Sequence, residues 1–205
     1  MTRVPDLSDT HALVDLGAIR ANARALSGFA AKPILAPIKA NAYGHGAIPV
    51  ARALEADVMG FAVATVSEAL ELRAAGIVKD VVLLTPAPVS ALPALVHNAV
   101  SFVVSSEEQL EALSREATTQ RETVRVHLKV NTGLNRLGAQ SEDAARVLAM
   151  LASKPFLELF GVMTHLVDSE DASPAWATRQ LERFNTFLET HAVAVPYRHA
   201  ANTGG

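Results

Sequence analysis

The sequence of 205 residues contains no cysteine. This excludes a disulfide framework, a thiolate nucleophile and a cysteine-ligated zinc or iron–sulfur site. A surplus of positive charge is missing as well, because 18 Lys and Arg residues stand against 21 Asp and Glu residues and the net charge is −3. Nucleic-acid-binding proteins gather Lys and Arg on one face, so we expect no nucleic-acid partner.

Long uninterrupted apolar runs are also missing. The most apolar stretch covers residues 81–100. Pro86, Pro88 and Pro93 break it, so it makes a poor membrane span. The N-terminal segment contains acidic residues, Asp15 among them, and lacks the basic start and apolar core of a secretory signal. The sequence therefore predicts a cytoplasmic protein with no membrane contact.

The chain does contain enough apolar residues for a core. Half of its residues are hydrophobic and 19% are charged, which is typical of a globular protein and not of a disordered one. No internal repeat, low-complexity tract or linker divides the sequence. We expect one domain over residues 1–205.

Short apolar runs alternate with helical patterns along the whole chain. The runs that predict buried strands are 34–38, 58–63, 81–84, 101–104, 124–130, 157–164 and 195–200. The segments between them that predict helices include 45–55, 67–75, 90–97, 142–153 and 176–191. Asp15 is a candidate N-cap for a first helix, and Ser105 with Glu108 predicts a capping box for the helix through Leu110.

This alternation is typical of a parallel sheet, either a doubly wound open sheet or a closed barrel. The strand count favours a (β/α)8 TIM-type barrel that is incomplete, with about seven strands present. Complete barrels of this type typically have about 250 residues. We expect an eighth strand to be absent, which would leave the first and last strands as open edges that favour aggregation.

Polar residues follow several of the predicted strands, at the end where parallel barrels place their active sites. Lys39 follows the first strand, Arg136 the fifth, His165 the sixth, and Asn202 and Thr203 the seventh. A lysine in this position is either a surface cation or a desolvated amine that can form a Schiff base.

The residues after Lys39 favour the second interpretation. Gly44 and Gly46 let the backbone approach a ligand closely, and the Tyr43 hydroxyl can donate a hydrogen bond to a phosphate. The two glycines do not complete a dinucleotide-binding fingerprint.

The whole run Ile38-Lys39-Ala40-Asn41-Ala42-Tyr43-Gly44-His45-Gly46 closely resembles the pyridoxal-phosphate attachment motif of bacterial alanine racemases. Further stretches of the chain resemble the same family in the same order: 14–16, 127–138, 164–165 and 199–203. A set of motifs in a fixed order is far more specific than any one of them.

The resemblance implies a role for each candidate residue. Lys39 would hold pyridoxal phosphate as a Schiff base and act as one of two acid/base groups at the substrate α-carbon. Arg136 would contact the cofactor phenolic oxygen and the substrate carboxylate. The remaining residues that the resemblance assigns to cofactor binding are Tyr43, Leu83, His165, Asn202 and Thr203.

Lys129 carries a carbamate in related enzymes, and the resemblance implies that this modified lysine orients Arg136. Three positions depart from the family pattern: Asn131 replaces the common Asp, Leu134 replaces the common Met, and Thr203 replaces the common Ser but keeps a hydroxyl. His127, His191 and His199 are given structural roles, and no metal site is expected.

The resemblance implies interconversion of L- and D-alanine by two-base proton transfer. In the family the second base is a tyrosine from a C-terminal β domain that reaches into the partner subunit. We expect that domain to be absent, this fragment alone to be inactive, and the full-length protein to be a homodimer. The alternatives are a racemase for another amino acid, such as serine, and a non-catalytic pyridoxal-phosphate carrier.

Overall fold

The computed structural model of the chain describes residues 11–167 and 175–203. Within them, seven parallel strands form one sheet in the sequential order β1 to β7. The strands are β1 (Leu35–Pro37), β2 (Gly60–Val63), β3 (Asp80–Leu83), β4 (Ser101–Val104), β5 (Val124–Lys129), β6 (Leu157–Met163) and β7 (Tyr197–His199). The order never reverses, as it would in a doubly wound sheet, so the prediction of an incomplete TIM-type barrel is confirmed.

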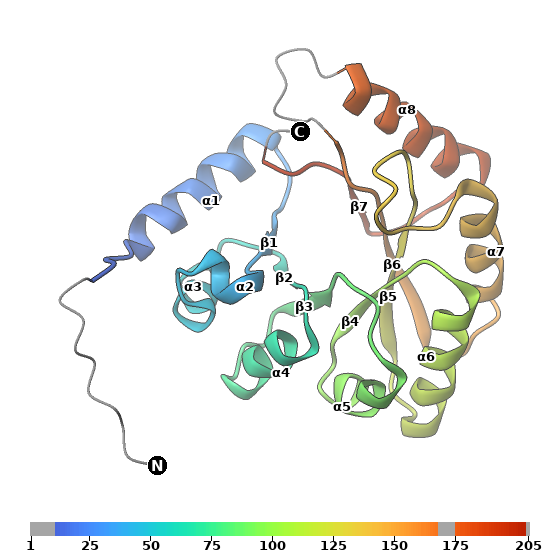
Figure 1. The fold of residues 1–205 in the computed structure, drawn as a ribbon, viewed down its shortest axis with the longest axis horizontal. Coiled ribbons are helices and arrows are strands. Elements are labelled where there is room, and N and C mark those ends of the chain that lie inside the picture. Colours follow the sequence, from blue (N-terminus) through green and yellow to red (C-terminus); the bar gives the residue numbers. More distant parts are fainter. Residues whose placement is uncertain (1–10, 168–174, 204–205) are drawn as a thin grey trace.

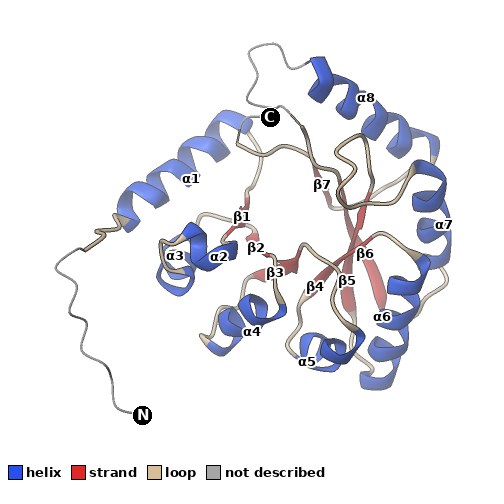
Figure 2. Ribbon diagram, in the orientation of Figure 1, coloured by secondary structure: helices blue, strands red, loops and turns tan. Residues whose placement is uncertain are grey.

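Helices connect the strands and cover the outside of the curled sheet (Figure 1, Figure 2). They are α1 (Leu16–Ala30), α2 (Lys39–Tyr43), α3 (Ala47–Leu54), α4 (Val66–Ala74), α5 (Leu92–His97), α6 (Glu107–Gln120), α7 (Ser141–Leu151) and α8 (Ala175–Thr190). A short 3-10 helix, η1 (Val89–Ala91), precedes α5. Among the residues described, no helix is both long and apolar enough to cross a membrane.

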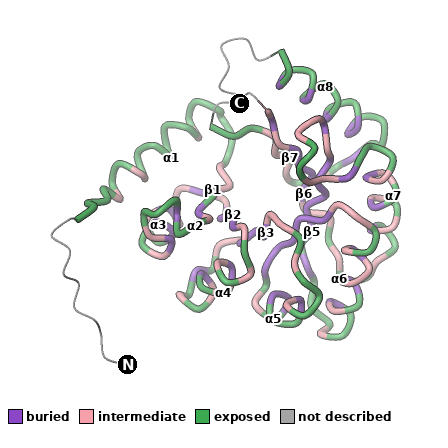
Figure 3. The backbone as a smooth tube through the Cα atoms, in the orientation of Figure 1, coloured by how far each residue is buried: buried purple, intermediate pink, exposed green. Residues whose placement is uncertain are grey.

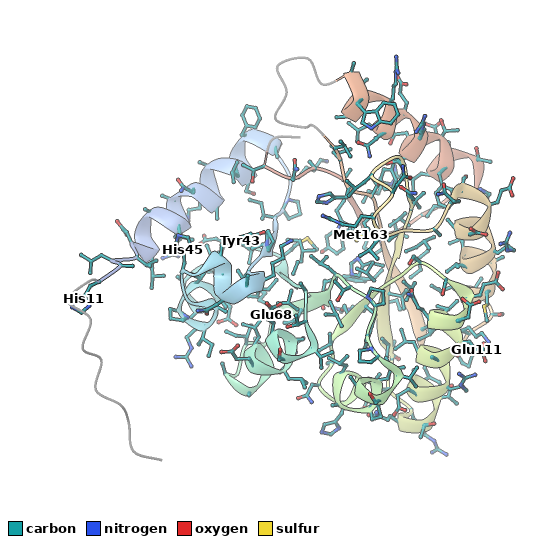
Figure 4. All side chains as sticks on the ribbon, viewed as in Figure 1. His11, Tyr43, His45, Glu68, Glu111 and Met163 are labelled. Atoms are coloured by element: carbon teal, nitrogen blue, oxygen red, sulfur yellow. The ribbon has the colours of Figure 1, made fainter. Side chains whose placement is uncertain are left out.

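The side chains of each strand alternate between two environments, as the two-residue period of a strand requires. In β5, Val124, Val126 and Leu128 join the large core between the sheet and its helices. His127 and Lys129, between and after them, lie on the other face and are also buried. A smaller cluster of Val82, Val103 and Met163 lies on that inner face, and Figure 4 labels Met163. The tube in Figure 3 is coloured as buried along much of the sheet. The interior of the barrel is therefore partly polar.

Most predicted boundaries move by one or two residues in the structure, and two of these changes bear on the argument. The first strand ends at Pro37 and not at residue 38, so Lys39 begins a separate turn after it. The N-cap of α6 is Ser106 and not Ser105, because the helix begins one residue later than predicted. The Ser106 side chain accepts a hydrogen bond from the Gln109 N–H at 3.3 Å. Gln109, and not Glu108, is therefore the third residue of the helix, which is the position that completes a capping box. The Asp15 cap is confirmed, since its carboxylate accepts from the Ala18 N–H at 3.0 Å.

Candidate active site

Lys39 stands at the start of a left-handed turn. Ala40, Asn41 and Ala42 all have φ between 52° and 55° and ψ between 47° and 50°, and Tyr43 has φ 54°. A left-handed helix costs about 1–2 kcal/mol per residue for L-amino acids other than glycine. Such a run persists only where surrounding contacts fix it, and it is the most strained backbone in the described part of the chain.

Several hydrogen bonds hold this turn. The Ala42 N–H donates to the Ile38 carbonyl at 2.8 Å, and the Gly44 N–H donates to the Ala40 carbonyl at 3.0 Å. The Asn41 side-chain oxygen accepts from the N–H of Ala47 at 2.7 Å, which joins the turn to the start of α3. Lys39 is therefore carried on a fixed piece of backbone at the carboxyl end of β1.

The loop after β5 carries Arg136 and closes on itself. The Ala139 N–H donates to the Lys129 carbonyl at 2.9 Å, and the Asn131 N–H donates to the Ala139 carbonyl at 2.8 Å. Gly138 has φ 115°, and a Cβ at this position would lie 2.9 Å from the Asn131 nitrogen. A side chain at position 138 would therefore open the loop.

Asn131 organises the same loop through its amide. Its side-chain oxygen accepts from the N–H groups of Gly133 and Asn135, both at 3.1 Å. Its side-chain nitrogen donates to the Asn135 side-chain oxygen at 2.8 Å. An aspartate could accept the first two bonds but could not donate the third. Asn135 thus provides the acceptor that an asparagine, and not an aspartate, can use at position 131.

The positive charges of Lys39 and Arg136 act on Lys129, and those of Arg136, Lys129 and Lys39 act on His165. Lys129 is only 5% exposed, and its pKa is lowered by burial and then by the positive charges of Arg136 and Lys39. The pKa of half-buried His165 is lowered by burial and by the charges of Arg136, Lys129 and Lys39. The structure therefore brings these four predicted residues together, and every charge that shifts the two pKa values is positive.

The other predicted residues have different surroundings. Tyr43 is 58% exposed, and Asn202 and Thr203 are exposed beyond the end of β7. Leu83 belongs to the core between the sheet and the helices, whereas its neighbours Val82 and Leu84 pack in the inner cluster. The structure thus places Leu83 away from the polar group, on the opposite face of β3.

A buried network under the loops was not predicted. The hydroxyls of Thr132 and Thr164 are 2.7 Å apart and hydrogen-bonded. The fully buried Gln180 of α8 donates to Thr132 at 3.3 Å and to the His165 carbonyl at 3.0 Å, and accepts from the Val167 N–H at 2.7 Å. Gln180 thereby joins the segments that carry Arg136 and His165. A single polar residue in a helical pattern gives no sequence signal for this role.

A cavity of about 600 Å³ lies between the loop after β5 and α8, lined by Asn131, Trp176, Arg183, Phe187 and neighbouring residues. The residues predicted to bind the cofactor do not line it. Within the described ranges, no group of three or more His, Asp or Glu side chains is placed to hold a metal ion. The convergent basic residues therefore remain the best candidate site.

Two histidines lie deeper inside the barrel. His127 Nδ1 and His199 Nε2 are 2.8 Å apart, and the two rings are nearly perpendicular. Burial and the charge of Arg125 lower the pKa of His127 to about 4. Burial and the neighbouring His127 lower the pKa of His199 to about 3, against a smaller opposite effect of Asp80. Both histidines are therefore neutral at pH 7.

This pair predicts a loss of stability in mild acid. Below the ordinary histidine pKa of about 6.5 the unfolded chain takes up protons that the folded pair cannot, so stability falls with pH from 6.5 towards 4. We expect the free energy of unfolding to fall by about 1 kcal/mol per pH unit for each histidine. Denaturant unfolding at pH 7, 6 and 5 would measure it. Equal stability at these pH values would contradict the prediction. His97→Gln, which changes an exposed histidine, is the control, and its free energy of unfolding should fall with pH as much as that of the unchanged chain.

The sheet is that of a parallel barrel, and it carries a lysine and further basic groups at the carboxyl ends of its strands, where barrels of this class have their active sites. The chain belongs to the family of the alanine racemase N-terminal domain, whose model matches residues 14–205. The resemblance proposed from the sequence is thereby confirmed.

Individual relatives agree with this assignment. The chain is 36% identical over 201 residues to an alanine racemase of Desulfovibrio desulfuricans, with 93% of this chain and 53% of that protein covered. It is 39% identical over 200 residues to an alanine racemase of Deinococcus deserti, with 97% and 54% covered. The chain thus spans about half the length of the curated relatives that it matches.

Solved structures show the same relationship. The alanine racemase from a D-cycloserine-producing Streptomyces lavendulae superimposes with a TM-score of 0.85 and 36% identity, over 93% of this chain and 52% of that one. The alanine racemase of Bacillus anthracis with bound L-Ala-P gives a TM-score of 0.84 and 32% identity, over 94% and 51%. A histidine racemase of Leuconostoc mesenteroides, 24% identical, shares the fold with a TM-score of 0.85.

Proposed function

We propose that this chain forms the cofactor-binding barrel of a pyridoxal-phosphate-dependent alanine racemase, which interconverts L- and D-alanine. The observation that carries the proposal is the convergence of Lys39, Lys129, Arg136 and His165 at the carboxyl ends of the strands. The positive charges of Lys39 and Arg136, which act on both other residues, favour an anion among them. The proposal also draws on the relatives named alanine racemase.

The residues fit pyridoxal phosphate. The cofactor has an anionic phosphate and phenolic oxygen, which suit a group of basic side chains, and an aldehyde, which requires a lysine amine. Bound there, it would supply the electron sink that stabilises the negative charge left when the α-proton departs. Lys39 would be the covalent attachment point.

The chain's own residues then perform the remaining steps. The Lys39 amine takes the α-proton from one face of the substrate or returns it. Arg136, exposed on its closed loop, would bind the substrate carboxylate and the phenolic oxygen. The hydroxyls of Tyr43 and Thr203 and the side chain of Asn202 would hold the phosphate, and half-buried His165 would support the cofactor ring.

Lys129 acts on Arg136 in this proposal. Its lowered pKa favours the neutral amine, which is the form that combines with carbon dioxide to give a carbamate and a proton. The carbamate is anionic and would pair with the guanidinium that a protonated lysine repels. We expect 13C NMR of the folded chain in 13C-labelled bicarbonate to show a carbamate signal that disappears in a Lys129→Arg variant. A signal that persists in Lys129→Arg and disappears in Lys32→Arg, changed at an exposed lysine, would contradict this assignment.

Racemisation requires a second base on the opposite face of the α-carbon. Lys39 supplies one base, and we propose that a tyrosine of a partner subunit's C-terminal β domain supplies the other, so that the active full-length protein is a homodimer. This chain of 205 residues, which spans about half the length of its relatives, would then bind cofactor without racemising alanine.

Borohydride trapping tests the proposed function directly. The chain is mixed with pyridoxal phosphate, reduced with borohydride, digested, and mapped for the labelled lysine. We expect selective labelling of Lys39 over the exposed Lys32. Equal labelling of all lysines, or selective labelling of another one, would overturn the assignment.

A further inference from the structure

Glu68 caps α4 through a reciprocal pair of hydrogen bonds. The Thr65 hydroxyl oxygen accepts from the Glu68 N–H at 3.2 Å, and the Glu68 carboxylate accepts from the Thr65 N–H at 3.0 Å. The same carboxylate oxygen, Oε2, also accepts from the Ala64 N–H at 2.8 Å. These contacts fix the segment that follows β2 to the start of α4.

The second oxygen of Glu68 leaves its own segment. Oε1 accepts from the N–H of Ala40 at 2.7 Å, although the two residues are 28 positions apart. Ala40 directly follows Lys39 and is the first residue of the left-handed turn. Figure 4 shows Glu68 between α4 and α2. One carboxylate therefore connects the ends of two neighbouring strands at the lysine.

The cap of α6 shows what helix capping alone requires. Gln109 occupies the same position in α6 as Glu68 does in α4, and its amide oxygen accepts from the Ser105 N–H at 2.9 Å. A glutamine has one accepting oxygen in its side chain, and that oxygen suffices for the cap. The carboxylate of Glu68 has a second accepting oxygen, and this oxygen accepts a hydrogen bond from the Ala40 N–H.

The charge of this carboxylate is maintained by its surroundings. Partial burial acts to raise the pKa of Glu68, but hydrogen bonds from the N–H groups of Ala64, Ala40 and Thr65 outweigh it, and the pKa lies below the ordinary glutamate value. An ionised carboxylate accepts hydrogen bonds more strongly than a neutral amide does.

We propose that Glu68 is a positioning residue for Lys39, which holds the left-handed turn so that the lysine amine faces the cofactor aldehyde. This inference rests on the proposed function. In a Glu68→Gln variant, one accepting oxygen becomes an NH2 group that opposes a backbone N–H, either of Ala40 or of Ala64 and Thr65. Since one oxygen suffices for the cap, as at Gln109, we expect it to stay on Ala64 and Thr65, so that the Ala40 N–H loses its acceptor and Lys39 its fixed orientation.

The test measures the rate at which pyridoxal phosphate labels Lys39 in the presence of cyanoborohydride, with Lys32 as the reference in the same sample. We expect Glu68→Gln to slow the labelling of Lys39 about tenfold or more, since misplacing a reacting group by about 1 Å can cost about a hundredfold in rate. The matched control is Gln109→Leu, which removes a cap at the same helix position far from Lys39. It should lower the melting temperature but leave the labelling ratio unchanged.

Each outcome decides a different point. Selective labelling of Lys39 in the unchanged chain, with the same rate in Glu68→Gln, overturns the role of Glu68 and leaves the proposed function standing. A fall of similar size in Gln109→Leu also overturns it. An absence of selective labelling in the unchanged chain overturns the proposed function and this inference together.

If the Glu68→Gln variant does not fold, a second measurement on the unchanged chain tests the hydrogen bonds of Glu68. In an NMR titration of the unchanged chain, the amide resonances of Ala40, Ala64 and Thr65 should shift together, with one midpoint below the ordinary glutamate range. A resonance of Ala40 that does not follow the other two would overturn the proposed connection.

Discussion

Replacing Lys39 with arginine should abolish covalent capture of pyridoxal phosphate, with a loss of more than about a hundredfold in trapped cofactor. Arginine keeps the positive charge and much of the length of lysine, but its guanidinium stays protonated and cannot attack an aldehyde. The fold should change little, because Lys39 is partly exposed and its side chain lies outside the core. Absorbance of the bound cofactor and borohydride trapping would measure the loss.

Lys32→Arg is the matched control for this experiment. Lys32 is an exposed residue that precedes β1, so its replacement should leave cofactor capture unchanged. Undiminished trapping in Lys39→Arg would show that another amine holds the cofactor. The assignment of the site to the end of β1 would then be wrong.

Gly161→Ala should cost about 2–4 kcal/mol of stability, as expected for overpacking combined with the loss of a buried hydrogen bond. Gly161 lies in β6, and a Cβ there would stand 2.4 Å from His127 Nδ1 and 2.9 Å from His199 Nε2. His127 is fully buried and cannot move aside. The variant must therefore break the contact between the two histidines or shift β6, and denaturant unfolding would measure the cost.

Gly28→Ala provides the opposite control. Gly28 lies within α1, and a Cβ added there would meet no atom within 4 Å. The substitution should stabilise the chain by about 0.5–1 kcal/mol, because alanine is the better helix former. A Gly161→Ala variant as stable as the unchanged chain would mean that the two histidines do not pack against Gly161.

Much of the fold could be predicted from local patterns. The run from Ser101 to Val104 matches β4 residue for residue, because a fully buried parallel strand consists of consecutive apolar or small residues. Asp15 could be predicted as a cap because capping is a contact within one helical turn. The sequential strand order also follows from the regular alternation of strands and helices.

The site could be predicted less completely. The positions of Lys39, Arg136 and His165 after their strands follow from chain order, so the resemblance and the topology agree on them. The left-handed turn could not be predicted, because alanine and asparagine have no preference strong enough to require it. Glu68 and Gln180 act on backbone groups of distant segments, and a single sequence contains no trace of such contacts.

The left-handed turn after Lys39 also affects how this protein can be improved. Glycine tolerates positive φ angles that alanine resists, so a glycine at the exposed Ala40 would relieve strain, whereas at the buried Ala42 it would also remove a methyl group from the core. Engineering for heat resistance usually removes glycines; at position 40 it should add one. A turn that contains glycine would also hold the Lys39 amine less firmly. Thermal stability of the chain and reactivity of Lys39 would therefore be in direct conflict at one short stretch of backbone.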